Sequence, residues 1–487
     1  MISKKKYYEI CQYFDEILNL DKIELICCEN LHVIRYHPVV INKYSLILKR
    51  KKFINIYIYF LKKIYQINLI YKLIFNLFKN NNFYLNFDDK KKNYQNIFFS
   101  HLININNYPN KFDHFFGFMP FLKENNYNLF ALFNHNNHSP KKIKNYKKNI
   151  FPTLILNHNY SFFKNINLIK NLLNIDNLLL KIIKKEKNKK KIIYLNYTRA
   201  LLFKYSTFRN LAFYYFIKNF FKENTIQNVL LTFEGHAWER LVINAAKINN
   251  INTIAYNQSG IFRLQHSVLR PLTQGYNPNI VMTPGVMSYN KFKYKLNNIL
   301  IKNIGSNRNK DNNIISNNKH HNSKNNILVL PEGIKSEAIL LINFLKKLYI
   351  ENKEFIFYIR MHPEYDLNKL NKDINLKKLP SNIIFTKDNF DSVCKKCNFV
   401  LHRGSTSVLE AVSRGLIPLY LLQKNEIIFS PISEKLRKYN IIKYINTNDF
   451  KKNTDYLKKN QFDLKLIEFA NKYYSKFNKN AYLECLL

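Results

Sequence analysis

The sequence is poor in cysteine, glycine and acidic residues. It has 6 Cys, 9 Gly and 1 Trp in 487 residues, with 33 acidic residues against 77 basic ones. Six unevenly spaced cysteines are too few for a disulfide scaffold and fit a reducing compartment. Cys394 and Cys397 have a CxxC spacing without a second pair, so two thiols at a helix end are favoured over a zinc or redox site.

Long apolar runs are also absent. The first residues are followed by Tyr and Glu and not by an apolar core, so no signal peptide is indicated. The best apolar stretch, residues 54–78, is interrupted by Lys62, Lys63 and Lys72. We interpret it as a helix that is either buried in a core or attached to a membrane surface. The prediction is a cytoplasmic protein, with peripheral contact with the inner membrane as a further hypothesis.

The formal net charge of +44 points first to nucleic acid or to an anionic membrane surface. Most basic residues are Lys, spread along the chain together with Asn, Ile, Phe and Tyr. All five residue types have AT-rich codons, so an AT-rich genome explains much of the charge. A nucleic-acid binder would more often cluster Arg with aromatic residues in one patch. We therefore predict no nucleic-acid partner.

The chain is long enough for more than one domain, and its 46% hydrophobic residues supply folded cores. We predict an irregular N-terminal extension of uncertain fold over residues 1–95. A Rossmann-like domain that holds the acceptor follows over 96–300. An Asn- and Lys-rich flexible linker or loop spans 301–326. A Rossmann-like domain that holds the nucleotide sugar covers 327–487.

This division into domains rests on the alternation of predicted strands and helices along the sequence. Short apolar segments separated by helical ones are typical of parallel α/β structure. The expected fold class is α/β, with two doubly wound domains facing a cleft and a final helix at 462–477. The expected strands are 229–233, 253–256, 280–283, 327–330, 355–360, 383–385, 399–401 and 418–422.

A turn of small residues follows the strand that ends at Leu401. Gly404 lets backbone N–H groups approach a phosphate, and the hydroxyls that follow can donate to it. Glu410 lies one helical turn later and can accept the two ribose hydroxyls. An ordinary Ser/Thr helix cap is the alternative, but it does not explain these features together. The predicted donor-binding residues here are His402, Gly404, Ser405, Thr406, Ser407 and Glu410.

A second motif, Arg360-Met361-His362-Pro363, follows another predicted strand. Arg360 offers a planar fork for phosphate, and His362 can donate to the departing nucleotide. A lone His in a strand-to-helix turn is the alternative. We predict a binding role for Arg360 and a catalytic role for His362.

A third motif places Glu234 after the strand 229–233, facing the cleft from the first domain. An acceptor hydroxyl needs a base, and a carboxylate at a strand end can supply it. The alternative is a solvated loop carboxylate. Glu234 is the predicted base, with His236 and Glu239 also open for that role.

Residues 402–418 resemble the nucleotide-binding motif of GT-B glycosyltransferases, with a His-x-Gly turn, Ser/Thr, Glu, then Gly and Pro. The His362-Pro363 and Ser/Thr pair is similar to motifs of bacterial sialyltransferases, Kdo transferases and teichoic acid glycerophosphotransferases. Those families use CMP- or CDP-activated donors. The resemblance therefore implies a cytidine nucleotide, most simply a CMP-linked acidic sugar.

Other segments together resemble a surface-carbohydrate family of O-antigen and capsule biosynthesis. They are residues 98–102, 112–136, 234–240 and 256–261. The resemblance implies that Gln258 and Ser259 line the cleft, where related transferases have Gln-His-Gly. Phe233 stands where related families have a first acidic residue, so the match is partial.

These motifs predict a metal-independent glycosyltransferase. It would move a sugar from a CMP-activated donor onto a surface polysaccharide or lipopolysaccharide precursor. The expected partners are a nucleotide-sugar donor and a glycan or glycolipid acceptor, with no cofactor beyond this co-substrate. Two alternatives stay open: a non-catalytic binding protein on the same fold, and a nucleotide-sugar epimerase.

Overall fold

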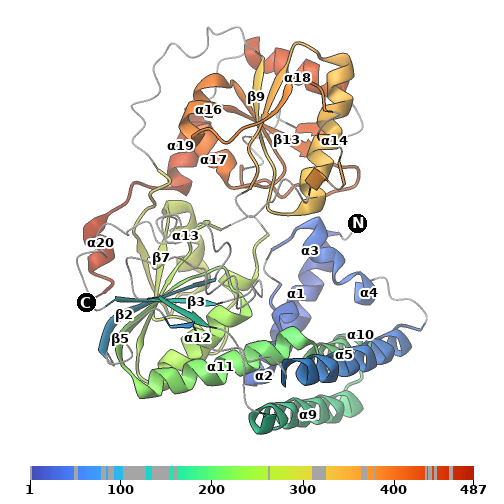
Figure 1. Cartoon of the computed structure of the whole chain (residues 1–487), viewed down its shortest axis with the longest axis vertical. Coiled ribbons are helices and arrows are strands. Elements are labelled where there is room, and N and C mark those ends of the chain that lie inside the picture. The colour runs from blue at the N-terminus through green and yellow to red at the C-terminus, as the bar shows by residue number, and fades with distance from the viewer. Residues whose placement is uncertain are drawn as a thin grey trace.

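In the computed structural model the chain forms two β-sheets, whose strands run parallel except for β1. One sheet lies above the other in Figure 1, and the N-terminal helices lie beside the lower sheet. The residues that the structure describes are 3–33, 35–48, 53–77, 84–85, 93–101, 128–133, 153–156, 162–261, 264–309, 325–362, 370–371, 373–374, 376, 379–433, 436, 441–443, 447–459 and 464–486.

The first sheet has the strand order β1-β4-β3-β2-β5-β6-β7-β8. β1 runs antiparallel to β4, and the other neighbours are parallel. The order reverses between β2 and β5, which makes this pair the switch point of a doubly wound sheet. The strands are β1 (Tyr84–Leu85), β2 (Asn93–His101), β3 (Asn128–Phe133), β4 (Thr153–Leu156), β5 (Thr225–Thr232), β6 (Asn252–Tyr256), β7 (Ile280–Thr283) and β8 (Leu300–Asn303).

The second sheet is parallel throughout, in the order β11-β10-β9-β12-β13-β14. Its switch point lies between β9 and β12. The strands are β9 (Asn326–Leu330), β10 (Ile356–Ile359), β11 (Ile383–Phe385), β12 (Phe399–His402), β13 (Ile417–Leu422) and β14 (Ile441–Lys443).

Helices cover the faces of both sheets, because the central strands are apolar along most of their length. β9 and β12 are buried at every residue, as expected for parallel strands covered on both sides. The helices between strands are α9 (Phe162–Lys185), α10 (Lys189–Leu202), α11 (Tyr205–Glu223), α12 (Ala237–Ile248) and α13 (Val286–Lys295) in the first domain, and α14 (Lys335–Glu351), α16 (Phe390–Lys396) and α17 (Ser407–Ser413) in the second. Helix α18 (Asn448–Lys459) follows the last strand, β14.

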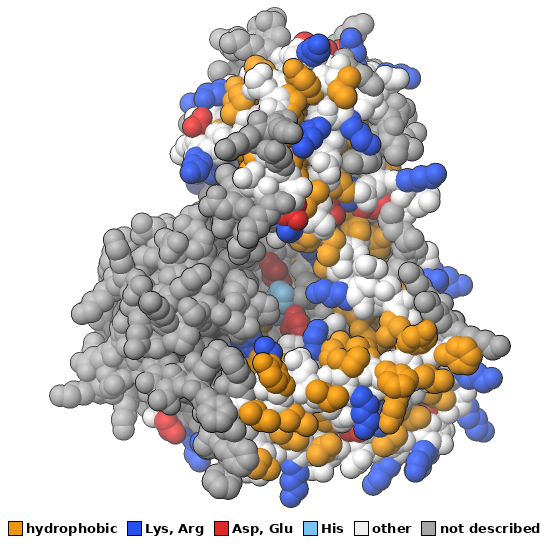
Figure 2. Space-filling model, turned by 45° about the vertical axis from the view of Figure 1, so that its right-hand side comes forward, with side chains coloured by type: hydrophobic (Ala, Val, Ile, Leu, Met, Phe, Trp, Pro, Cys, Tyr) orange, Lys and Arg blue, Asp and Glu red, His pale blue; other side chains and the backbone are white. Residues whose placement is uncertain are grey.

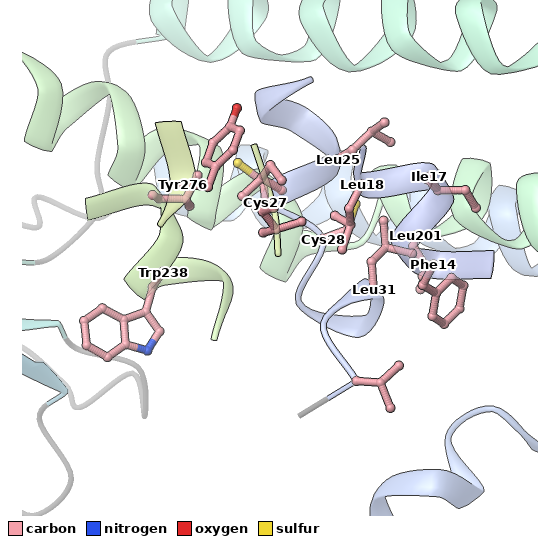
Figure 3. Packing of buried hydrophobic residues seen from close by; sticks show 14 of the residues in the cluster. Phe14, Ile17, Leu18, Leu25, Cys27, Cys28, Leu31, Leu201, Trp238 and Tyr276 are labelled. Atoms are coloured by element: carbon pink, nitrogen blue, oxygen red, sulfur yellow. The ribbon is translucent and has the colours of Figure 1, made fainter. Parts of the chain in front are cut away.

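The N-terminal segment is helical and shares the core of the first domain. Side chains of α1 and α2 lie in one cluster with Leu201 of α10, Trp238 of α12 and Tyr276, which precedes β7, as Figure 3 shows. The extension predicted to be irregular over residues 1–95 is thus a packed helical layer up to Leu77, and it also supplies β1 and the start of β2 to the first sheet. Its helices are α1 (Lys4–Leu18), α2 (Ile23–Ile26), α3 (Pro38–Asn42), α4 (Ser45–Leu48) and α5 (Ile54–Leu77), with the 3-10 turn η1 (Glu29–Leu31).

The end of the chain returns to the first domain. Helix α19 (Leu464–Tyr473) packs on both α17 and α13, and α20 (Lys479–Leu483) follows. The backbone of Ser475 donates to Pro284 at 2.8 Å, and Asn478 donates to Ile304 at 2.8 Å. Gly305 has a φ of 76°, and a Cβ there would overlap the carbonyl of Lys476. Only glycine therefore allows this close approach.

The predicted α/β fold class with two doubly wound domains is confirmed. The expected strands are present within a few residues, and β1, β4, β8 and β14 are additional strands that the sequence did not predict. β8 occupies the start of the segment predicted as a linker, because Leu300–Asn303 pairs with β7. The final helix predicted over 462–477 is α19, which ends at Tyr473, and α20 is an additional helix beyond the predicted range. The stretch 112–127 and residues 134–136, which formed part of the family resemblance, lie outside the described residues.

The six cysteines are buried free thiols, including Cys394 and Cys397. In the part of the chain that the structure describes, no helix is both long enough and apolar enough to cross a membrane.

Candidate active site

The carboxyl ends of the two sheets meet between the domains. Arg308, which follows β8 of the first sheet, contacts residues that follow β12 of the second. Tyr474 donates a hydrogen bond to the carbonyl of Ser259, which follows β6, at 3.2 Å. Figure 2 shows a hollow between the two parts of the molecule, with a histidine between acidic side chains in it. Ligands of open α/β sheets bind at this edge, near the switch points.

Arg308 lies among the predicted donor-binding residues. Its Nη1 is 3.4 Å from Thr406 Oγ1, 3.8 Å from Glu410 Oε1 and 2.9 Å from Tyr474 Oη. Burial lowers the pKa of Arg308, but Tyr474 and Glu410 outweigh burial and raise it, so the guanidinium stays charged. The arrangement offers a cation, a hydroxyl and a carboxylate together, which can contact phosphate and ribose. The sequence did not reveal Arg308, because it lies at the edge of the polar stretch interpreted as a linker.

The hydroxyl turn after β12 is partly accessible. Ser405, Thr406 and Ser407 are half-buried, and Thr406 occupies the N-cap position of α17. Its side chain makes no capping hydrogen bond, so an ordinary helix cap does not account for it. Helix α17 has only 7 residues, so its dipole adds little, and Arg308 supplies the positive charge.

His402 and Gly404 have packing roles in the structure. His402 is 1% exposed, and its ring lies 5.5 Å from that of Tyr420. A Cβ at Gly404 would overlap Glu332 and the ring of Phe429. The close approach that requires this glycine is therefore made by protein side chains, whereas the sequence suggested a phosphate.

Arg403, between these two residues, is an internal counter-ion. It is fully buried and binds Glu337 Oε2 through Nε at 2.5 Å. Its Nη2 binds Glu426 Oε1 at 2.6 Å, and Nη1 donates to the carbonyl of Leu421 at 2.8 Å. This arginine thus joins α14 to the loop after β13 and does not face the cleft.

Glu332, after β9, connects the second domain to the N-terminal segment. Its Oε2 lies 3.0 Å from Arg35 Nη2 and 3.6 Å from His37 Nε2. The ring of His37 also packs edge-on against Phe429 at 4.8 Å. Arg35 therefore compensates the charge of the Glu332 carboxylate, which lies beside Gly404.

Arg360 and His362 lie directly after β10, the strand beside β9. Arg360 donates to the carbonyl of Asp388 and lies 5.7 Å over the ring of Phe390. His362 lies beside the loop after β9, since a Cβ at Gly333 would be 2.9 Å from its Nδ1. Pro363 and Glu364 lie outside the described residues. The structure thus brings His362 to the switch point, while Arg360 already has a protein partner.

A partly buried Glu–His–Glu arrangement lies after β5 in the first domain. His236 Nδ1 is 2.8 Å from Glu29 Oε1, and Nε2 is 3.7 Å from Glu234 Oε2. The three side chains are 23–28% exposed, so a ligand can reach them.

Burial lowers the pKa of His236, but Glu29 and Glu234 outweigh burial and hold it well above its usual value. Burial raises the pKa of Glu29, but His236 outweighs it and the net pKa is about 2. The expected neutral-pH state is an imidazolium between two carboxylates.

Glu239 shapes the loop that carries these groups. Its carboxylate accepts from the backbone N–H groups of Glu234, Gly235 and His236 at 2.7–3.0 Å. The side chain is fully buried, and burial raises its pKa to about 7. Of the three residues left open for the base, Glu239 is occupied as a cap, and Glu234 and His236 face the cleft.

Gln258 and Ser259 form the turn after β6. Gln258 is 7% exposed, and its Oε1 has no hydrogen-bond partner among the described residues. A hydroxyl or amide of a ligand can donate to such an oxygen. Ser259 is half-buried, and its hydroxyl donates to the carbonyl of Gly260 at 3.4 Å.

No cluster of three or more His, Cys, Asp or Glu side chains that could hold a metal ion occurs within the described ranges.

No protein-family model matches this chain, and no curated protein does. Several solved structures share its general arrangement. The glycotransferase of kitacinnamycin is 6% identical over 82% of this chain and 100% of its own, with a TM-score of 0.46. The calicheamicin glycosyltransferase CalG4 is 10% identical over 80% and 95%, with a TM-score of 0.44. A UDP-N-acetylglucosamine 2-epimerase is 10% identical over 79% and 92%, with a TM-score of 0.40. At these values the likeness carries no information about substrate or reaction.

We expect Arg403→Leu to destabilise the second domain by about 3–5 kcal/mol, because it leaves two buried carboxylates without a counter-ion. Thermal unfolding followed by circular dichroism measures the loss. Lys396→Ala is the control, since its ion pair with Asp388 is about half exposed and should contribute no more than about 1 kcal/mol. Equal effects of the two changes would contradict a structural role for Arg403.

Proposed function

We propose that the chain is a glycosyltransferase that uses a nucleotide-activated sugar. The observation that carries the proposal is that two chemically different groups lie at the carboxyl ends of the two sheets, one group at each sheet. The group at the second domain is Thr406 and Glu410, together with Arg308, which reaches them from the end of β8 in the first domain. It has the chemistry to hold phosphate and ribose. The group on the first domain, Glu234 with His236 and Glu29, has the chemistry to move a proton.

In the proposed reaction the donor nucleotide lies at the switch point of the second sheet. Thr406 and Arg308 donate hydrogen bonds to the phosphate, and His362 does so from the neighbouring strand. These donors stabilise the negative charge that grows on the phosphate as the bond to the sugar breaks. Glu410 accepts hydrogen bonds from the ribose.

The acceptor lies against the first domain, where Gln258 can take one of its polar groups. Glu234 removes the proton of the attacking hydroxyl, and the oxygen then forms the new bond to the anomeric carbon. The imidazolium of His236 positions the Glu234 carboxylate, and Glu29 fixes the ring through Nδ1. Glu239 holds the loop that carries Glu234.

The donor and acceptor classes are part of the proposal. The resemblance of the His362-Pro363 and Ser/Thr motifs supports a cytidine nucleotide, and thus a CMP-linked sugar. The resemblance to surface-carbohydrate proteins supports a polysaccharide or lipopolysaccharide precursor as acceptor, with metal-independent action in the cytoplasm. A product assay without acceptor separates transfer from epimerisation, since only an epimerase converts the donor alone.

Nucleotide binding tests the donor site. We expect calorimetry to give tighter binding of CMP than of UDP or GDP. Thr406→Val and His362→Ala should each weaken that binding about tenfold or more, because each removes a hydrogen bond to a charged group. Ser392→Ala, an exposed hydroxyl on α16, is the control. Weak or equal binding of CMP would exclude the cytidine assignment, and unchanged affinity in both variants would exclude the site.

Glu234→Gln tests the base. The change keeps the shape of the side chain but removes its basicity. We expect nucleotide affinity to stay the same and the transfer rate to fall about 100-fold or more. Glu223→Gln, at the exposed end of α11, should change neither quantity. Retained transfer in Glu234→Gln would move the role of base to His236.

The pH dependence of kcat/KM tests the charge state of His236. We expect activity at neutral pH and a fall on the alkaline side, where the imidazolium loses its proton. Glu29→Gln removes a charge that raises the pKa of His236, so the alkaline fall should move to lower pH. Glu16→Gln, an exposed carboxylate of α1, is the control. Activity that rises through the same pKa would instead make neutral His236 the base.

A further inference from the structure

Helix α5 has one apolar face that is exposed. Its inner face packs on α10 and α11, with Ile58 and Leu69 each 2% exposed. Lys62 fixes the helix by pairing with Asp176 of α9. The outer face, which we name the α5 face, consists of side chains that are each more than half exposed: Ile56, Phe60, Ile64, Ile67, Tyr71 and Ile74.

The spacing of these residues places them in a single stripe. Steps of three and four residues repeat along the helix, so the side chains lie above one another over about five turns. Figure 2 shows hydrophobic side chains gathered over the lower part of the molecule, where Figure 1 places α5. Exposed apolar stripes of this length normally mark a contact surface.

The charges around the stripe are positive. Helix α5 contains Lys62, Lys63 and Lys72 and no acidic residue. Lys63 lies at the edge of the stripe, with its Nζ 5.6 Å over the ring of Tyr59. The neighbouring α9 adds more lysines, and its one acidic residue, Asp176, is bound to Lys62 and Arg199. Apolar and aromatic side chains bordered by lysines fit a membrane interface, where the chains enter the lipid and the ammonium groups reach the headgroups.

We propose that α5 lies flat in the interface of an anionic lipid bilayer and anchors the protein there. The helix has 24 residues but does not combine this length with the apolarity needed to cross a membrane, which agrees with a position in the plane of the interface. A second copy of the chain is a poorer occupant, because pairing two α5 faces would bring lysines of like charge together. The total charge of +44 adds to that repulsion and to the attraction of anionic lipid.

The inference is independent of the proposed function. Figure 2 shows the hydrophobic area and the hollow between the domains on the same face of the molecule. A bound bilayer would therefore lie on the side where the hollow opens, which suits an acceptor carried on a lipid if the transferase proposal is correct.

Vesicle co-sedimentation tests the anchor on the full chain, with vesicles of phosphatidylcholine alone or mixed with phosphatidylglycerol. We expect binding to the mixed vesicles and much weaker binding to the neutral ones. The double change Ile64→Glu and Ile67→Glu should reduce partitioning more than tenfold, because it places two charges in the inserted face. Lys63→Gln should reduce it about fivefold, as expected for one basic residue near an anionic surface.

The control is the double change Tyr294→Glu and Ile350→Glu, which alters two exposed side chains on α13 and α14. It should bind vesicles like the unmodified chain. Circular dichroism checks that each variant is folded, and nucleotide binding checks the cleft separately. Failure of the unmodified chain to bind mixed vesicles, or equal loss in the control, would overturn the proposal. So would a dimer in light scattering that only the α5 variant converts to monomer, since the face would then bind a second copy.

Discussion

The close contact between the returning C-terminal segment and the loops after β7 and β8 is the constraint on which the cleft depends. Gly285 and Gly305 leave room for the backbone of residues 473–476, and a Cβ at either would overlap it. This contact holds Tyr474 between Ser259 and Arg308. Arg308 in turn reaches Thr406 on the other domain. The relative position of the two sheet edges is thus fixed by backbone packing, and the polar contacts follow from it.

The two sides of the cleft differ in the charges that they must stabilise. The second-domain side must tolerate a bound anion although Glu332 and Glu410 lie there, and Arg35 and Arg308 compensate these carboxylates. The first-domain side must keep carboxylates charged while they are partly buried. His236 does this for Glu29 and Glu234, whereas Glu239 is fully buried and its pKa is raised to about 7 although three loop N–H groups donate to it. Each of these charges therefore has a partner, and several of the partners come from a distant part of the chain.

Local patterns predicted the architecture well because parallel strands are short apolar runs with clear ends. The strands β5, β9 and β12 were each predicted within a few residues, and the motifs after them lie at the two switch points. What the sequence could not show is long-range pairing. Glu29 contacts His236 across 207 positions, and Arg35 contacts Glu332 across 297. The motifs predict that Gly404 and His402 bind the donor. The sequence could not show that Phe429 and Glu332 approach Gly404 or that His402 is buried beside Tyr420.

The chain path has a consequence for biosynthesis. The first sheet is completed by strands made early, yet its loops are covered by residues 473–486, and Asn228 of β5 donates to the carbonyl of Leu486. A ribosome releases those residues only after the whole second domain has been synthesised. Both domains are therefore completed late, because the same last segment covers loops of the first domain and adds the side chains of α19 to the core of the second.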